Sequence, residues 1–303
     1  MLDQLGFTKE EIKNLKKPNE FADTEYNFSH QEVKDLKLKK KDIIHLINLG
    51  FTKENIEHIT LEDWLHFKNK DAELVTVNTS YALRNEETGD FIPTTKEVFE
   101  QQKAKKENTG EVSTLALCDP NVGCTAHNSG SSIKLTVTVV RSGTIYAINS
   151  SFEWSSNPAN LYRDLLSSGY HDYLTMDFSS IYGNYETDYY DLNTNTLKHT
   201  TNTALGGKNA SSTTGYTQYI DLHSNSYQLS TGQWVTSKYH GGYTYGEFYW
   251  SSGTSASAFT YYTHVKTSWN TSWTLSYPWS VGVTIDQTTQ DQVIPDASVS
   301  FTK

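Results

Sequence analysis

Residues 133–301 contain a series of segments in which apolar and polar residues alternate. The segment 133–139, Ile-Lys-Leu-Thr-Val-Thr-Val, is the clearest, and Phe152 with Trp154 and the run 174–178 repeat the pattern. Alternation with a period of two gives a strand that is buried on one face. About nine such segments are separated by turn residues, and Gly241-Gly242 predicts a two-residue hairpin turn. Because no helical pattern lies between the segments, a parallel α/β fold is excluded, and an antiparallel β-sandwich or jelly roll is expected.

The distribution of charge divides the chain near residue 109. Residues 1–109 hold 17 of the 25 basic and 21 of the 35 acidic side chains, whereas residues 110–303 hold 8 and 14. The second part has 18 of the 20 tyrosines and 6 of the 7 tryptophans. We therefore expect an α+β protein with two domains. A charged, mainly helical leader domain with a small hairpin covers residues 1–109, and the sandwich covers residues 110–303.

Helix-start signals recur in residues 1–109. The octapeptide Leu-Gly-Phe-Thr-Lys-Glu-Glu-Ile at 5–12 returns at 49–56 with one substitution. Thr8 and Glu11 form a reciprocal N-terminal cap, and Thr52 and Thr60 start further helices. Two copies are fewer than a solenoid needs, so we expect two similarly capped helical turns packed together, with a small peptide-binding module as the alternative. Residues 73–92 predict the hairpin, and residues 94–106 predict a charged helix.

Cys118 and Cys124 flank the sequence Asp-Pro-Asn-Val-Gly, which favours a turn. Such a turn brings the two thiols near bridging distance and predicts a disulfide, with free buried thiols or a redox or metal pair as alternatives. The Ser/Thr/Tyr-rich composition fits an exported domain, extracellular or at the cell surface, where a disulfide persists. The first twenty residues have no apolar signal core, so we expect any export signal to be removed or absent from this chain. No apolar run approaches the roughly 18 residues that span a bilayer.

Several of these segments together resemble a group of uncharacterised secreted proteins of Gram-positive bacteria. The segments are Cys118-x5-Cys124, Ile133 to Val139, Tyr146-Ala-Ile-Asn149, Phe152-Glu-Trp154 and Arg163-Asp164. Proteins of this group similarly carry a charged helical leader region before a Ser/Thr/Tyr-rich β domain. The resemblance covers residues 50–180, and it implies export and a fold class but no reaction.

Recognised catalytic and cofactor motifs are missing from the chain. A net charge of -10 argues against a chain-wide contact with nucleic acid. Nucleotide-binding glycine loops, a nucleophile-elbow serine and paired metal-binding histidines are absent, so no cofactor is expected. Glu186, Asp188 and Tyr190 alternate onto one strand face and could supply oxygen ligands for calcium, but a solvated strand face or loop is the favoured interpretation. A glycosidase would need two carboxylates facing one cleft, and Glu153 and Glu247, the glutamates of the aromatic strands, are the candidates, although Glu153 is expected to be exposed.

The aromatic side chains give the largest signal for binding. Tyr243, Tyr245 and Tyr249 share one strand face with Glu247. Because an unpaired carboxylate is costly to bury, we expect this face to be exposed and its rings to contact a ligand. The alternative is that the rings are ordinary core fillers.

These observations favour an exported, non-enzymatic β-sandwich protein that acts as a surface-binding or structural module. Its partner would be a glycan or another cell-surface or membrane component. One rival is a β-pore-forming toxin with an activation segment, because Lys266 is the only charged residue in 251–277. A carbohydrate-active enzyme is the weaker rival. The candidate processing segment carries Lys103, Lys105 and Lys106, where we expect the leader to be cut.

Overall fold

The computed structural model describes residues 1–15, 28, 30–85, 90–109, 132–155, 163–170, 173–191, 193–205, 210–212, 215–222, 226–265, 274–276, 280–282, 291–294 and 296–303. The helices are α1 (Lys9–Leu15), α2 (Gln31–Asp35), α3 (Lys40–Asn48), α4 (Lys53–Glu57), α5 (Leu61–Phe67) and α6 (Lys96–Thr109). The strands are β1 (Glu73–Arg84), β2 (Phe91–Thr94), β3 (Ser132–Ser142), β4 (Ile145–Trp154), β5 (Arg163–Tyr170), β6 (Leu174–Tyr190), β7 (Leu197–Ala204), β8 (Ala210–Ser212), β9 (Gly215–Asp221), β10 (Ser226–Gln228), β11 (Trp234–Trp250), β12 (Ser255–Val265), β13 (Thr274–Ser276), β14 (Ser280–Gly282), β15 (Asp291–Val293) and β16 (Ala297–Thr302).

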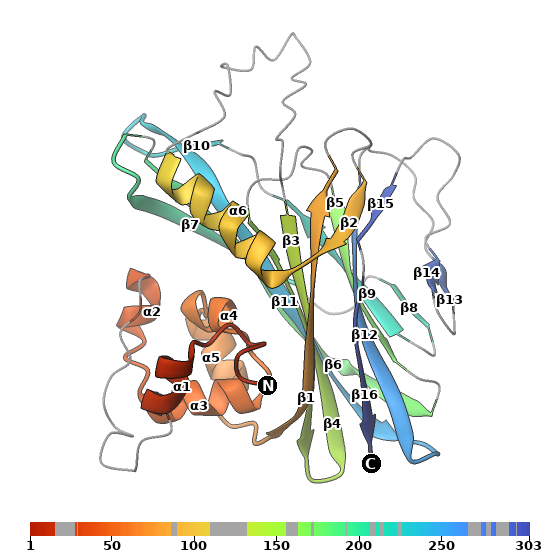
Figure 1. Ribbon diagram of the computed structural model, residues 1–303. Coiled ribbons are helices and arrows are strands. Elements are labelled where there is room, and N and C mark those ends of the chain that lie inside the picture. Colours follow the sequence, from red (N-terminus) through yellow and green to blue (C-terminus); the bar gives the residue numbers. More distant parts are fainter. Residues whose placement is uncertain are drawn as a thin grey trace.

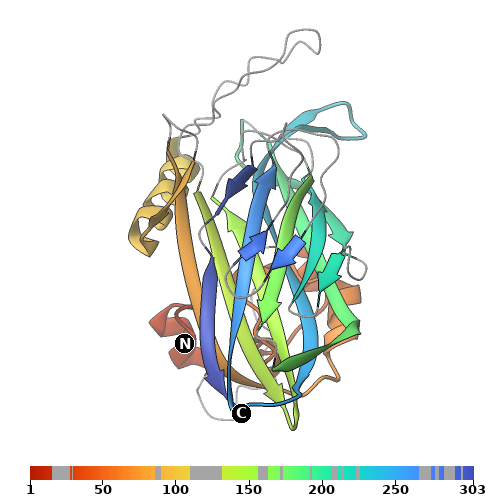
Figure 2. The ribbon, with the colours of Figure 1, turned by 90° about the vertical axis from the view of Figure 1, so that its right-hand side faces the viewer.

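Two antiparallel sheets pack face to face. The eight-stranded sheet has the order β2-β1-β3-β4-β11-β6-β7, with β10 added to β11, and the six-stranded sheet has the order β15-β12-β5-β9-β8, with β16 added to β12. Leu135 and Phe152 from the first sheet share a core with Tyr216 and Tyr262 from the second. Figure 2 shows the six-stranded sheet in front, with helices α1–α5 on the far side. The antiparallel β-rich fold expected from the alternating segments is confirmed.

Helices α1–α5 form a third layer on the outer face of the eight-stranded sheet (Figure 1). This helical layer has its own apolar core, which includes Leu46 and Phe67 together with Val140, Tyr243 and Tyr245 from the sheet. Strands below the layer are therefore covered on both faces, and Ser132 to Val140 of β3 are buried without interruption. The alternation in β3 still separates the faces, because its apolar residues 133–139 enter the sandwich core and its polar ones face the helices.

The helix starts follow the sequence signals. The Thr8 backbone N–H donates to the Glu11 carboxylate at 2.7 Å, and Thr52 and Thr60 cap α4 and α5 in the same way. The two octapeptide copies are packed together, because the Lys53 backbone N–H donates to the Leu5 carbonyl at 2.8 Å. Gly50 ends α3 with a φ of +83°, and an added Cβ would lie 2.7 Å from the Thr138 methyl carbon. The layer therefore sits close against β3.

Two expectations differ from the structure. The hairpin assigned to the leader, β1 and β2, belongs to the eight-stranded sheet, where β1 pairs with β3 from Glu73 to Leu83. The Gly241-Gly242 turn is wrong, because β11 runs through both glycines. An added Cβ at Gly242 would lie 2.6 Å from the Asn184 carbonyl oxygen, so this glycine allows a close approach of β6 rather than a turn.

Candidate functional site

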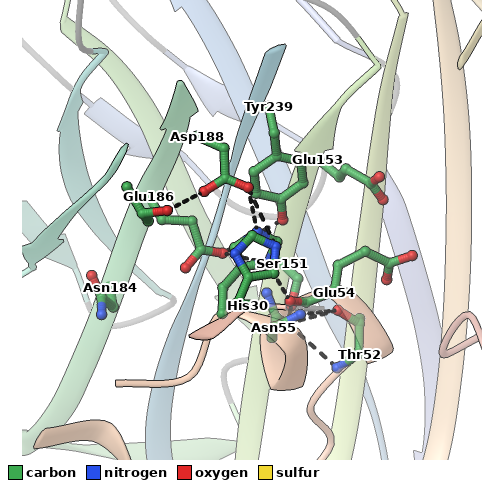
Figure 3. A network of polar contacts seen from close by, with 12 residues as sticks. His30, Thr52, Glu54, Asn55, Ser151, Glu153, Asn184, Glu186, Asp188 and Tyr239 are labelled. Carbon is green, nitrogen blue, oxygen red and sulfur yellow. Dashed lines mark hydrogen bonds and ion pairs between the residues drawn. The ribbon is translucent and has the colours of Figure 1, made fainter. Parts of the chain in front are cut away.

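Ionisable side chains gather between the helical layer and the outer face of the eight-stranded sheet (Figure 3). Period-two alternation turns Lys134, Glu153, Glu186 and Asp188 away from the sandwich core, and the helices then cover them. Each of these four side chains is at most 5% exposed. Burial of this many charges requires partners in the opposite layer, and the structure supplies them in three groups.

The first group is centred on Asp63 of α5, which is fully buried. Its carboxylate accepts hydrogen bonds from the Tyr243 hydroxyl at 2.7 Å, the Tyr182 hydroxyl at 2.9 Å and the Asn184 amide at 3.0 Å. It also accepts from the Thr60 backbone N–H, which completes the cap of α5. One side chain thus starts a helix and attaches that helix to β6 and β11.

The second group is centred on Glu153 of β4. The Lys134 ammonium lies 2.7 Å from the Glu153 carboxylate and 3.0 Å from the carboxylate of Glu54 in α4. Lys103 of α6 also pairs with Glu153. Burial opposes ionisation of Glu153, but the two ammonium groups outweigh it and lower the pKa to about 2. Burial likewise opposes the charge of Lys134, and Glu153 and Glu54 overcome this and raise the pKa of the ammonium.

The third group brings two histidines to β6. The His58 Nε2 lies 3.0 Å from the Asp188 Oδ2, and the His30 Nε2 lies 3.5 Å from the same oxygen. The His58 Nδ1 lies 2.8 Å from the Glu54 carbonyl oxygen and 3.5 Å from Glu186. The Tyr239 ring stacks on His58, with ring centroids 4.3 Å apart and planes nearly parallel. Both imidazoles and both carboxylates are shielded from solvent.

The carboxylates decide the charge of His58. Burial lowers its affinity for a proton, but Glu186 and Asp188 outweigh burial and raise the pKa to about 10. Burial and the neighbouring positive His58 lower the pKa of His30 to about 4. Burial also raises the pKa of Glu186 well above its usual value, with His58 opposing this shift. At neutral pH the group therefore contains one imidazolium, one neutral imidazole and the Asp188 carboxylate.

The predicted aromatic face is only partly exposed. Tyr243 and Tyr245 are 3% exposed beneath the helical layer, so the expectation of exposure is wrong for both. Tyr249 is 49% exposed, as expected. The Glu247 carboxylate, which was expected to lack a partner, lies 2.5 Å from the Lys70 ammonium. The physical reason is that the helices cover most of this face and supply the cation.

The two glutamates considered for glycoside hydrolysis do not form a pair. Glu153 is 2% exposed rather than exposed as expected. It lies opposite Gly241, whereas Glu247 lies opposite Ala147. Six strand residues separate the two positions, which is about 20 Å and exceeds the spacing of roughly 5–9.5 Å that glycosidases use.

Other predicted residues are only partly within the described part of the chain. Cys118 and Cys124 lie outside the described residues. Lys103 lies in α6 and pairs with Glu153, whereas the side chains of Lys105 and Lys106 are not among those described. Within the described residues, no helix has the length and apolarity needed to cross a bilayer.

Sequence reasoning missed the pair of histidines. His30 and His58 are 28 positions apart and Asp188 lies in another layer, so no local spacing identifies the group. The one available signal is the acidic run 185–191, whose alternation places Glu186 and Asp188 on one face. That face is buried rather than solvated.

Comparisons with known proteins show only distant likeness. No protein-family model and no curated protein matches the chain. A solved "Pore forming protein" is 5% identical, covering 57% of this chain and 85% of its own, with a TM-score of 0.24. The KRT10-binding region domain of the pneumococcal serine rich repeat protein PsrP is 13% identical (44% and 77% covered, TM-score 0.21), and Clostridium perfringens delta-toxin is 9% identical (77% and 93% covered, TM-score 0.22). At these scores the likenesses assign no activity.

Proposed function

We propose that this protein is an exported, non-enzymatic β-sandwich module that binds a cell-surface glycan at one end of its eight-stranded sheet. The observation that carries this proposal is a cluster of large apolar side chains left outside the helical layer. Tyr249, Ile145 and Tyr173 are 49%, 44% and 41% exposed. A tyrosine offers a flat apolar ring and a hydroxyl, and sugars stack on such rings while their hydroxyls form hydrogen bonds.

The strand register brings these three side chains to one place, which we call the aromatic end. Tyr249 of β11 pairs with Thr175 of β6, two residues after Tyr173. On its other side, Phe248 pairs with Tyr146, which puts Ile145 beside Tyr249. Strands β4 and β11 and the residue just before β6 therefore contribute to one exposed surface.

The aromatic end is held rigidly. Lys70 from the helical layer fixes Glu247, and the Glu247 backbone N–H donates to the Ser180 hydroxyl at 2.7 Å. Tyr173 packs over Gly253, and its carbonyl accepts from the Ser251 backbone N–H at 2.8 Å. Binding side chains on such a fixed backbone lose little entropy when a ligand arrives. The Ser/Thr/Tyr-rich composition of residues 110–303 supports export.

A glycan array tests the proposal with the variants Tyr249→Ala and Tyr173→Ala. We expect wild type to bind a limited set of glycans and each variant to bind about fivefold more weakly, because a stacked ring contributes on the order of 1 kcal/mol. Tyr227→Ala is the matched control, since Tyr227 is also partly exposed but lies in β10, paired near the first residues of β11.

Three results would contradict glycan binding at the aromatic end. The first is a wild-type protein that binds no glycan on the array. The second is a Tyr249→Ala protein that binds as well as wild type. The third is release of dye from liposomes by protein without glycan binding, which would favour the pore-forming alternative.

A further inference from the structure

We infer that His30, His58 and Asp188 form a zinc site that fastens the helical layer to the eight-stranded sheet. Each residue offers one ligand atom, and the three atoms lie within 4.8 Å of one another. His30 immediately precedes α2, His58 follows α4, and Asp188 lies in β6. The site does not depend on the proposed glycan binding, because it lies under the helices and not at the aromatic end.

The spacing of the ligand atoms suits a four-coordinate ion. Zinc binds histidine nitrogen and carboxylate oxygen at about 2.0–2.2 Å, which places tetrahedral ligand atoms about 3.3 Å apart. The His58 Nε2 and the His30 Nε2 lie 3.0 Å and 3.5 Å from the Asp188 Oδ2. Imidazole nitrogens select zinc over calcium and magnesium, which prefer oxygen ligands.

Neighbouring groups orient two of the three ligands. The His58 Nδ1–H donates to the Glu54 carbonyl oxygen at 2.8 Å, which directs Nε2 toward Asp188. The Thr200 hydroxyl donates to the Asp188 Oδ1 at 2.6 Å, which leaves Oδ2 facing the two imidazoles. Partners of this kind, a carbonyl behind the histidine and a donor behind the carboxylate, are typical of protein zinc sites.

The charge around the group also suits a dication. Asp188 and Glu186 are both buried, and nitrogens of His30 and His58 lie 3.0–3.5 Å from their oxygens. The nearby ammonium groups of Lys134 and Lys103 pair instead with Glu153 and Glu54. With both imidazoles neutral, the Asp188 carboxylate is the anionic ligand of the ion.

Binding replaces a proton by the metal. Zinc takes the position of the proton between the His58 Nε2 and Asp188, and that proton passes to solvent. Three protein ligands leave the fourth coordination position to a solvent molecule. Because ligands come from both layers and are buried, the ion contributes to attachment of the helices to the sheet.

Calorimetric titration of the metal-free full-length protein with Zn²⁺ tests the site. We expect one equivalent to bind, and we expect Co²⁺ to give the visible absorption bands of a four-coordinate ion with nitrogen ligands. His30→Gln, His58→Gln and Asp188→Asn should each weaken binding by about 100-fold or more, and Thr200→Val by about tenfold. The control His66→Gln, an exposed histidine of α5, should bind like wild type.

Far-UV circular dichroism establishes that each variant is folded. If His58→Gln does not fold, Asp188→Asn and the Co²⁺ spectrum of wild type decide the question. Wild-type protein that binds no Zn²⁺ at micromolar concentration would overturn the site. Binding by Asp188→Asn at wild-type strength, or equal losses in His66→Gln and His30→Gln, would overturn it as well.

Discussion

Glu153 shows how a single buried charge links the layers. Its carboxylate holds Lys134 from β3 and Lys103 from α6. Replacing Glu153 by Gln leaves the buried Lys134 with Glu54 alone, and breaking a buried pair of this kind costs about 3 kcal/mol of unfolding free energy. Urea denaturation measures the loss. Glu73→Gln, at the exposed pair with Arg141, is the control and should cost less than about 1 kcal/mol. Equal losses in the two variants would contradict this assignment.

The same carboxylate predicts a dependence of stability on pH. Folding lowers the pKa of Glu153 from 4.5 to about 2, because two ammonium groups outweigh its burial. A lowered pKa gives a stabilisation that is complete above pH 4.5 and is lost as the pH falls from 4.5 toward 2. The difference in unfolding free energy between wild type and Glu153→Gln should therefore shrink below pH 4.5. A difference that is constant across this range would show that the carboxylate is not held ionised.

The sequence correctly predicts which face of a strand a side chain lies on, but it does not predict whether the helices bury that face. Alternation correctly predicts that Glu153 lies on the opposite strand face from Phe152 and Trp154. It does not make Glu153 exposed, because the helical layer covers that face. Tyr243 and Tyr245 were misjudged for the same reason, whereas Tyr249 lies beyond the helices and is exposed. The contact of His30 with His58 depends on tertiary packing, which no local pattern encodes.

Helix α5 is the element most dependent on one side chain. Asp63→Ala removes the acceptor for two tyrosine hydroxyls and an amide from the sheet, and it also removes the carboxylate half of the α5 capping box. We expect a loss of about 3 kcal/mol, since each buried donor left unpaired costs about 1–3 kcal/mol. Hydrogen exchange should become faster in α5 while β5 and β12 keep their protection.

Two variants separate the contribution of the cap from that of the interface. Tyr243→Phe keeps the cap and removes one hydrogen bond to Asp63, so it should cost about 1 kcal/mol. Glu62→Ala, at the exposed neighbour of Asp63, should leave exchange in α5 close to wild type. Unchanged exchange in Asp63→Ala would show that the apolar contacts alone hold α5.

Element-level prediction was accurate where a local signal exists. The caps at Thr8, Thr52 and Thr60 are present because each depends on residues within one helical turn. Long-range pairing had no such signal, so β1 was assigned to the leader although it pairs with β3 across a long intervening segment. The two glycines of β11 led to a wrong prediction of a turn, because close packing of strands and tight turns both favour glycine.

At the scale of the whole molecule, a cut in the processing segment should not release the leader. Strand β1 is hydrogen-bonded to β3 from Glu73 to Leu83, and Asp63 and Lys70 bind side chains of the large sheet. Limited trypsin digestion followed by mass spectrometry is expected to show cleavage near residues 103–112. Lys103 should resist because its ammonium pairs with Glu153, so Lys105 and Lys106 are the expected sites.

Size-exclusion chromatography of the digest distinguishes a nicked complex from two free domains. We expect the two fragments to elute together in native buffer and to separate in urea, because separation requires breaking the β1–β3 ladder and uncovering buried charges. Uncut protein in the same two buffers is the control. Fragments that separate without denaturant would show that residues 1–109 are an independent domain. Primary cleavage within residues 132–303 would instead place the accessible site in the sandwich and contradict the processing segment.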